Sequence, residues 1–124
     1  MKRKTLAAGV LTGILMMAVV GCGSKNTTNI DAGMEAIAAL DYDAALTSFE
    51  AAKEAGEDTR LLYRGEGIAY MGKTMYSEAV EAFEKALSSS NGVIENMDYD
   101  MNYYLATAYF KQGDYDQAIA VYDA

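Results

Sequence analysis

The sequence predicts an all-α fold, an α-solenoid of about three helix-turn-helix repeats. Proline is absent from all 124 residues, which favours uninterrupted helices. Apolar side chains recur three and four positions apart, as in Ala79, Val80 and Phe83, and this spacing marks one buried stripe on an amphipathic helix. Similar segments also return at a regular interval, which indicates stacked copies of one helical unit.

The repeat becomes visible when three segments are written one above another. They are ALDYDAALTSFEAA from Ala39, KTMYSEAVEAFEKA from Lys73 and QGDYDQAIAVYDA from Gln112. Equivalent positions carry Tyr42, Tyr76 and Tyr115; Ala45, Ala79 and Ala118; Leu46, Val80 and Ile119; and Phe49, Phe83 and Tyr122. The copies are offset by 34 residues (42 to 76) and by 39 residues (76 to 115). The same register pairs small residues further upstream: Gly33, Gly67 and Ala106.

The repeated unit therefore covers two helices, and the elements are predicted in pairs along the chain. The predicted pairs are 29–40 with 42–55, 59–71 with 75–88, and 98–111 with 114–124. Each first helix carries the small residue of the upstream register, and each second helix carries the equivalent alanine. Small residues at these positions suit backbones that cross closely, because larger side chains would push the paired helices apart.

Capping residues predict where several of these helices begin and end. Asp41 and Asp114 precede the second helix of their pairs, where a carboxylate can accept free N–H groups of the first turn. Gly56 is expected to end the second helix of the first pair. Residues 88–98 contain the run SSSNG and hold the five additional residues of the longer interval. They are therefore predicted to form a loop that ends at a capping Asp98.

The run LATAYFKQGDYDQAI, residues 105–119, together with the 34-residue interval, resembles the tetratricopeptide repeat. The resemblance covers residues 30–124 and implies repeats at about 30–59, 60–97 and 98–124, the last one incomplete. Some family features are absent. The first copy lacks the aromatic residues of its first helix, Tyr63 stands where the family often has tryptophan, and the closing proline is missing.

The N-terminal residues carry a targeting signal. Residues 2–4 are basic, residues 6–20 are apolar, and Val19-Val20-Gly21-Cys22 follows the order of a bacterial lipoprotein lipobox. This resemblance implies a signal peptide at 1–21, a lipid on Cys22, and a flexible tether at 22–29. An uncleaved anchor is disfavoured, because fifteen apolar residues fall short of the roughly 20 that span a bilayer. Cys22 is the only cysteine, so it cannot form an intramolecular disulfide.

Composition excludes several classes of function. The formal net charge is −8 and the Lys and Arg residues beyond the signal are scattered, so we expect no nucleic-acid partner. Histidine is absent, and no phosphate loop or nucleophile elbow is present, so we expect no enzyme and no cofactor apart from the covalent lipid. Residues 98–102 begin like a calcium loop, but Tyr103 occupies the glycine position, so no metal site is predicted.

The resemblance also implies a concave groove, lined by the first helix of each repeat, that binds a protein or peptide. The groove residues are expected to be Met34, Ile37, Arg64, Ile68, Met71, Tyr103, Thr107, Phe110 and Lys111. Only two of them are basic, so a clamp for a terminal carboxylate is disfavoured, and an apolar or helical peptide suits the methionines and aromatics better. The alternative is that some of these residues pack against neighbouring helices.

We therefore expect a non-catalytic interaction scaffold, lipid-anchored on the extracytoplasmic face of the cell membrane in a bacterial envelope. The alternative is the non-catalytic N-terminal part of a longer envelope enzyme or cell-wall-related protein. Ala124 falls within the last predicted helix, which favours a truncated chain. Otherwise, another chain would cover the open face of Ala118, Ile119 and Tyr122. The oligomeric state is not predicted.

Overall fold

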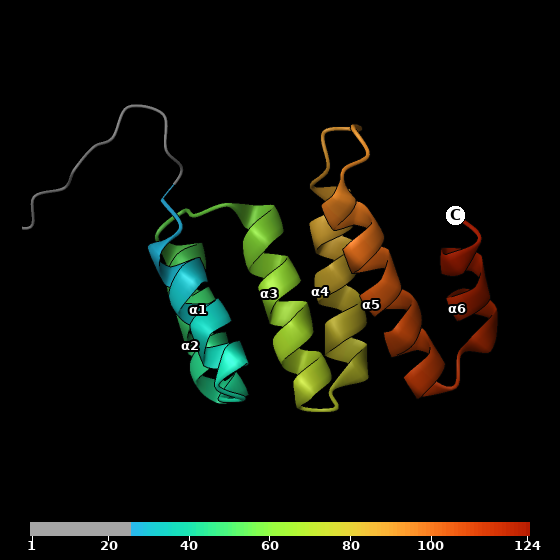
Figure 1. The fold of residues 1–124 in the computed structure, drawn as a ribbon, viewed down its shortest axis with the longest axis horizontal. Coiled ribbons are helices and arrows are strands. Elements are labelled where there is room, and N and C mark those ends of the chain that lie inside the picture. Colours follow the sequence, from blue (N-terminus) through green and yellow to red (C-terminus); the bar gives the residue numbers. More distant parts are fainter. Residues whose placement is uncertain (1–25) are drawn as a thin grey trace, which may run out of the picture.

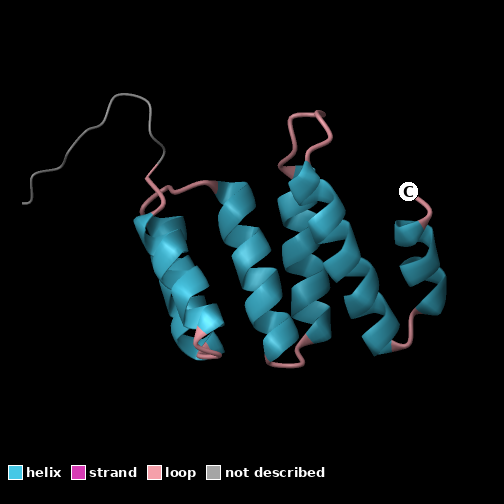
Figure 2. Ribbon diagram, in the orientation of Figure 1, coloured by secondary structure: helices cyan, strands magenta, loops and turns pink. Residues whose placement is uncertain are grey.

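The computed structural model describes residues 26–124, which form six helices in sequential pairs (Figures 1 and 2). The helices are α1 (Thr28–Ala38), α2 (Tyr42–Glu54), α3 (Thr59–Gly72), α4 (Tyr76–Ser88), α5 (Asn96–Gln112) and α6 (Tyr115–Tyr122). The predicted all-α fold class is confirmed, and every predicted boundary lies within two residues of the observed one. The predicted signal peptide and Cys22 lie outside the described residues.

The predicted aspartate caps of the second helices are present. The Asp41 side chain accepts the N–H of Ala44 at 3.1 Å, and Asp114 accepts that of Gln117 at 3.4 Å. Each bond satisfies a first-turn donor that has no partner within the helix. Gly56 follows α2 in the left-handed conformation, with φ of 68°, so its predicted role in ending that helix is also confirmed.

The expected capping role of Asp98 is wrong, because α5 begins two residues earlier than predicted. Glu95 is the N-cap and Asp98 is the third helical residue, and each side chain accepts the backbone N–H of the other residue. The bond from the Glu95 N–H to the Asp98 carboxylate is 2.7 Å. This reciprocal capping box satisfies two free donors, whereas a single cap at Asp98 would satisfy one.

The turn inside each helical pair places one residue in the left-handed region. These residues are Leu40, Thr74 and Gly113, with φ of 60°, 59° and 84°. The N–H of the next residue then bonds to the carbonyl five positions back, as from Asp41 to Ala36 at 2.9 Å. Only the third copy places glycine there, so the other two turns carry the steric cost of a Cβ in this conformation.

The pairs stack in chain order, and the row of helices is visible in Figure 1. Among the described residues, α1 contacts α3 and α3 contacts α5, whereas α2, α4 and α6 do not contact one another. The first helices are therefore closer together, which places α1, α3 and α5 on the inner, concave side of the array. Two core clusters lie along the row, one centred on Phe49 and one on Phe83, and Tyr63 packs against both.

Glycines provide the space for the core aromatic rings. A Cβ built on Gly33 would lie 2.5 Å from the Phe49 ring, and one on Gly65 would lie closer still to the same ring. Gly67 stands in the same relation to Phe83, at 2.7 Å. The prediction that small residues mark the helix crossings is thus confirmed: Gly33, Gly67, Ala106, Ala45, Ala79 and Ala118 are all buried.

The start of α1 is held by a residue 27 positions further along the chain, which the sequence did not indicate. The buried Glu57 carboxylate, in the α2–α3 loop, accepts the N–H groups of Asn29 at 3.0 Å and Ile30 at 2.9 Å, and the Asn29 amide at 2.8 Å. Burial opposes ionisation of Glu57, but these bonds outweigh it and lower the pKa of the carboxyl below its ordinary value. Glu57 therefore acts as the cap that Thr27 does not provide.

Candidate partner-binding surface

The predicted groove residues of the first two repeats are largely part of the core. Met34 and Ile37 on α1 are half-buried against the cluster around Phe49. Ile68 and Met71 on α3 are half-buried against the cluster around Phe83. These four side chains lie on the first helices, as expected, but much of their apolar surface is already covered by neighbouring helices.

The face between α3 and α5 is bridged by ion pairs instead of being an uninterrupted apolar trough. Arg64 binds Asp100 through Nε, at 3.0 Å, and through a terminal nitrogen. One turn away, Arg60 bridges Glu95, at 3.1 Å, and Asp98. This part of the groove is therefore lined by paired charges in addition to the apolar side chains that the sequence predicts. Because Arg64 already forms an ion pair with Asp100, it is not free to bind the carboxylate of a ligand.

The buried character of Asp98 shows that these pairs are structural. The Glu95 backbone N–H and the Arg60 guanidinium hold the pKa of Asp98 below its ordinary value, although burial opposes this shift. The sequence signal was a pair of arginines four positions apart on one helix, followed 35 to 38 residues later by acids at the start of the equivalent helix. Arg60 does not occupy one of the groove positions that the family resemblance implies, so the sequence did not identify it as part of this face.

The third repeat presents its predicted groove residues to solvent. Tyr103 is 60% exposed and Phe110 is 56% exposed. The Thr107 hydroxyl lies between them and donates to the Tyr103 carbonyl at 2.8 Å, so it is engaged within the helix. Lys111 is exposed, and within residues 26–124 it is the one Lys or Arg that takes part in no ion pair. α5 therefore contributes most of the accessible groove.

Exposed large apolar side chains continue from α5 onto α6, and we call this surface the end face. It consists of Tyr99, Tyr103 and Phe110 on α5 and Tyr115, Ile119 and Tyr122 on α6. The members on each helix are spaced by four and by seven or three positions, so they share one helical side. The rings of Phe110 and Tyr115 meet edge to face at 5.3 Å and join the two stripes. Of the predicted open face, Ile119 and Tyr122 are exposed, whereas Ala118 is buried.

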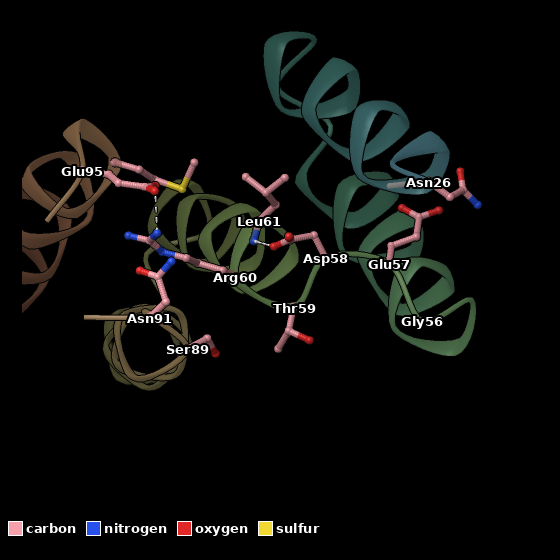
Figure 3. A pocket seen from close by; sticks show the side chains of 11 residues that line it. Asn26, Gly56, Glu57, Asp58, Thr59, Arg60, Leu61, Ser89, Asn91 and Glu95 are labelled. Carbon is pink, nitrogen blue, oxygen red and sulfur yellow. Dashed lines mark hydrogen bonds and ion pairs between the residues drawn. The ribbon is translucent and has the colours of Figure 1, made fainter. Parts of the chain in front are cut away.

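A polar cavity of about 780 Å³ lies beside the loops that precede α3 and α5, and Arg60 and Glu95 are among its lining residues (Figure 3). Its charged lining residues already have partners. Glu57 caps α1, Asp58 caps α3 by accepting the Leu61 N–H at 3.0 Å, and Glu95 pairs with Arg60. None of the nine predicted groove residues lines it. Each charged side chain in the lining is therefore already engaged within the chain, although the Nε atom of Arg60 is buried without a hydrogen-bond partner.

No arrangement for metal binding or proton transfer stands out in the described part of the chain. Residues 26–124 contain no group of three or more His, Cys, Asp or Glu side chains that could hold a metal ion. Tyr109 donates its hydroxyl to Glu84 at 2.6 Å, and this bond, with burial, raises the pKa of the phenol to about 12. The phenol stays protonated near neutral pH and does not serve as a base.

Comparison with known protein families identifies the repeat. The tetratricopeptide repeat matches residues 30–93 and, in a second overlapping register, residues 64–124. No curated protein and no solved structure matched the chain. The family match covers the whole helical array, and the observed pairs of stacked helices agree with it. Domains of this kind typically act as non-catalytic scaffolds for protein–protein interaction, and this chain belongs to the tetratricopeptide repeat family.

Proposed function

We propose that this protein is a lipid-anchored scaffold on the extracytoplasmic face of a bacterial cell membrane, which binds a protein or peptide on its concave side and has no catalytic activity of its own. The family assignment supports a protein partner. The choice of surface rests on one observation. Two aromatic rings on α5, those of Tyr103 and Phe110, are exposed to solvent on the concave side. Exposed aromatic side chains are typical anchors of protein interfaces.

The charge balance limits what such a partner can be. All 18 acidic residues of the chain lie within residues 26–124, together with only six Lys and Arg residues. Five of these six cations are held in ion pairs inside the array. The outer surface is therefore strongly electronegative, which favours a neutral or basic partner and disfavours nucleic acid.

The membrane location rests on the N-terminal sequence. A basic cluster, a short apolar run and the lipobox-like order before Cys22 support cleavage and lipidation at that cysteine. Within residues 26–124, every helix is too short or too polar to cross a bilayer. Each buried methylene of an acyl chain contributes about 0.8 kcal/mol, so two or more chains would hold the domain on the membrane.

The location is tested by mass spectrometry of the N-terminal peptide from membranes of a bacterial host. A peptide that begins at Cys22 with acyl and diacylglyceryl groups is expected. The control is Cys22→Ala, which should leave an unlipidated precursor of higher mass. Recovery of the wild-type protein with residues 1–21 still attached and Cys22 unmodified would refute the lipoprotein assignment.

The binding surface is tested by cross-linking in membranes followed by identification of the captured proteins. Tyr103→Glu and Phe110→Glu place a charge on the accessible part of the groove and should abolish capture of any specific partner. Ile94→Glu is the matched control, because Ile94 is an exposed apolar residue in the α4–α5 loop, at 74%. A captured set that is the same for all three variants would refute the concave site.

A further inference from the structure

The loop between α4 and α5 carries an exposed apolar tip that the concave-site proposal does not use. The tip consists of Val93 and Ile94, which are adjacent and are 58% and 74% exposed. Ile94 is the most exposed large apolar side chain of residues 26–124, and neither residue is part of the two core clusters. The shorter repeat interval of 34 residues has no such segment, so the stacking of repeats does not require the tip.

The polar residues of this loop bond to its own backbone. The Ser90 hydroxyl accepts the N–H of Gly92 at 3.3 Å, and the Asn91 side-chain oxygen accepts that of Val93 at 3.1 Å. None of residues 86–94 carries a charge. An unbonded N–H or a charge is expensive to remove from water, so a tip without charge and with these donors already bonded can leave water at low cost.

The tip projects from the end of the array at which the chain enters α1. Figure 1 shows the α4–α5 loop extending beyond the helices at that end. The polar cavity agrees with this placement, because Asn26 lines it together with Ser89 and Asn91 of the loop. The turns inside the helical pairs, at 39–41, 73–75 and 113–114, lie at the opposite end.

The proposed lipid anchor would hold this same end close to the bilayer. Asn26 is only four positions after Cys22. Four extended residues span at most about 14 Å. A surface tethered at so short a distance meets the bilayer at a high effective concentration, so a contact too weak to bind a free protein is sufficient.

We propose that the tip of the α4–α5 loop, Val93 and Ile94, inserts into the lipid surface beside the anchor. This inference rests on the proposed N-terminal lipid and adds a second membrane contact to it. Insertion removes two aliphatic side chains from water. Two contacts at one end would hold the helices away from the bilayer, which leaves the concave side open to a partner.

Charge favours this tip over other surfaces of the domain as the contact. Residues 26–124 contain 18 acidic residues and six Lys and Arg residues, so anionic phospholipids repel most of the surface. The acids that follow the tip are engaged within the chain, because Glu95 and Asp98 both pair with Arg60. Electrostatic repulsion falls off within about 8 Å at physiological salt, so an uncharged projecting tip can reach the lipid.

The test uses the full-length protein, isolated from bacterial membranes and reconstituted into vesicles of phosphatidylethanolamine and phosphatidylglycerol. An environment-sensitive fluorophore is attached through Asn96→Cys, at an exposed position directly after the loop. A second preparation carries the fluorophore through Ala39→Cys, which is exposed at the opposite end. Lipidation blocks the Cys22 thiol, so only the introduced thiol reacts. Quenching by a spin-labelled lipid should be several-fold stronger at position 96 than at position 39.

Substitutions decide whether the apolar side chains of the tip make this contact. With the fluorophore at position 96, Ile94→Glu should lower the ratio of lipid-bound to free loop by about tenfold or more, because a carboxylate replaces an apolar contact. Leu40→Glu is the matched control, since Leu40 is 72% exposed in the α1–α2 turn, and it should leave the quenching unchanged. The fluorophore is the same in both variants, so its own affinity for lipid cancels. Circular dichroism checks that both variants keep their helices.

A different anchor separates this inference from the proposed location. Residues 22–124 carrying Cys22→Ala and Asn96→Cys are held by an N-terminal histidine tag on vesicles that contain a nickel-chelating lipid. This chain contains all six described helices. If mass spectrometry finds Cys22 unmodified, the proposed location fails, and the quenching in this preparation still shows whether the loop contacts a bilayer placed beside Asn26.

The inference is overturned if verified lipidated protein shows equal quenching at positions 96 and 39, or if Ile94→Glu leaves the quenching at 96 unchanged. It is also overturned if the fluorophore leaves water in native membranes but not in vesicles of pure lipid, because a protein would then cover the loop. Ile94→Glu retains the lipid anchor, so it still serves as the control for capture on the concave side.

Discussion

The substitution Gly65→Ala provides the sharpest test of how the repeats pack. The added Cβ would overlap the Phe49 ring at its Cζ and Cε1 atoms, and the α1 backbone at Gly33 confines the same ring so closely that a Cβ built there would lie 2.5 Å from it. Overpacking of a well-filled core costs about 1–3 kcal/mol. The intrinsic gain of alanine over glycine in a helix is only about 0.8–1 kcal/mol. We therefore expect a net loss of up to about 2 kcal/mol despite the better helix former.

This loss is measured by urea unfolding followed by circular dichroism at 222 nm. For a domain of this size, about 1 kcal/mol corresponds to a decrease of roughly 4–8 °C in Tm. The control for helix propensity is Ala32→Gly at an exposed position of α1, which should cost about 1 kcal/mol without any steric contribution. Alanine should therefore give the less stable protein at position 65 and the more stable protein at position 32.

A double mutant identifies Phe49 as the cause. Phe49→Leu removes the ring edge that Gly65→Ala would strike, so the two changes together should cost at least about 1 kcal/mol less than the sum of the single losses. The reasoning is refuted if Gly65→Ala stabilises the protein as a surface glycine-to-alanine change would. It is refuted equally if the losses from the two substitutions are additive.

Three further predictions concern turns and titrating groups. Leu40→Gly should stabilise the protein by about 0.5–1 kcal/mol in urea unfolding, because the exposed Leu40 has a left-handed backbone conformation that glycine adopts without strain. This relief should exceed the cost of the added conformational entropy of the unfolded chain. A destabilised variant would contradict this. Glu57→Gln should cost about 1.5–3 kcal/mol at pH 7. Because the folded pKa of Glu57 lies below the ordinary value of about 4.3, this difference from wild type should be complete above about pH 5 and disappear as the pH falls through the folded pKa; a difference independent of pH would exclude the carboxylate cap. Glu84→Gln should lower the pKa of Tyr109 from about 12 toward about 10, as followed by NMR of ring-labelled tyrosine, and an unchanged titration would show that Glu84 does not hold the phenol.

The fold could be predicted from the sequence because its signals are local and repeated. Helix spacing, small residues at the crossings and aspartate caps all lie within one repeat. The first two features recur in all three copies and the aspartate cap of the second helix in two, and they support the same interpretation. The start of α5 was misplaced because two acids, Glu95 and Asp98, compete for the capping position. Their reciprocal bonds decide it, and a single-residue pattern does not contain that information.

The site was predicted less well than the fold, because it depends on contacts between repeats. Family positions identified the inner helices correctly, but they did not show that Met34 and Ile68 are half-buried. Nor did they show that Arg64 is already paired with Asp100, 36 residues away. Burial and pairing at such separations depend on how neighbouring units stack, and a periodic pattern within one unit does not specify this.

If the domain is anchored through its N-terminal side, as we propose, the carboxylate cap on α1 has a mechanical consequence. Tension on the chain ahead of Asn29 would be loaded directly onto the three bonds that one carboxylate makes with Asn29 and Ile30. These bonds share one acceptor group and would be loaded together instead of opening one after another. Glu57 would then keep the first helix attached to the rest of the domain while the chain that precedes it is under tension.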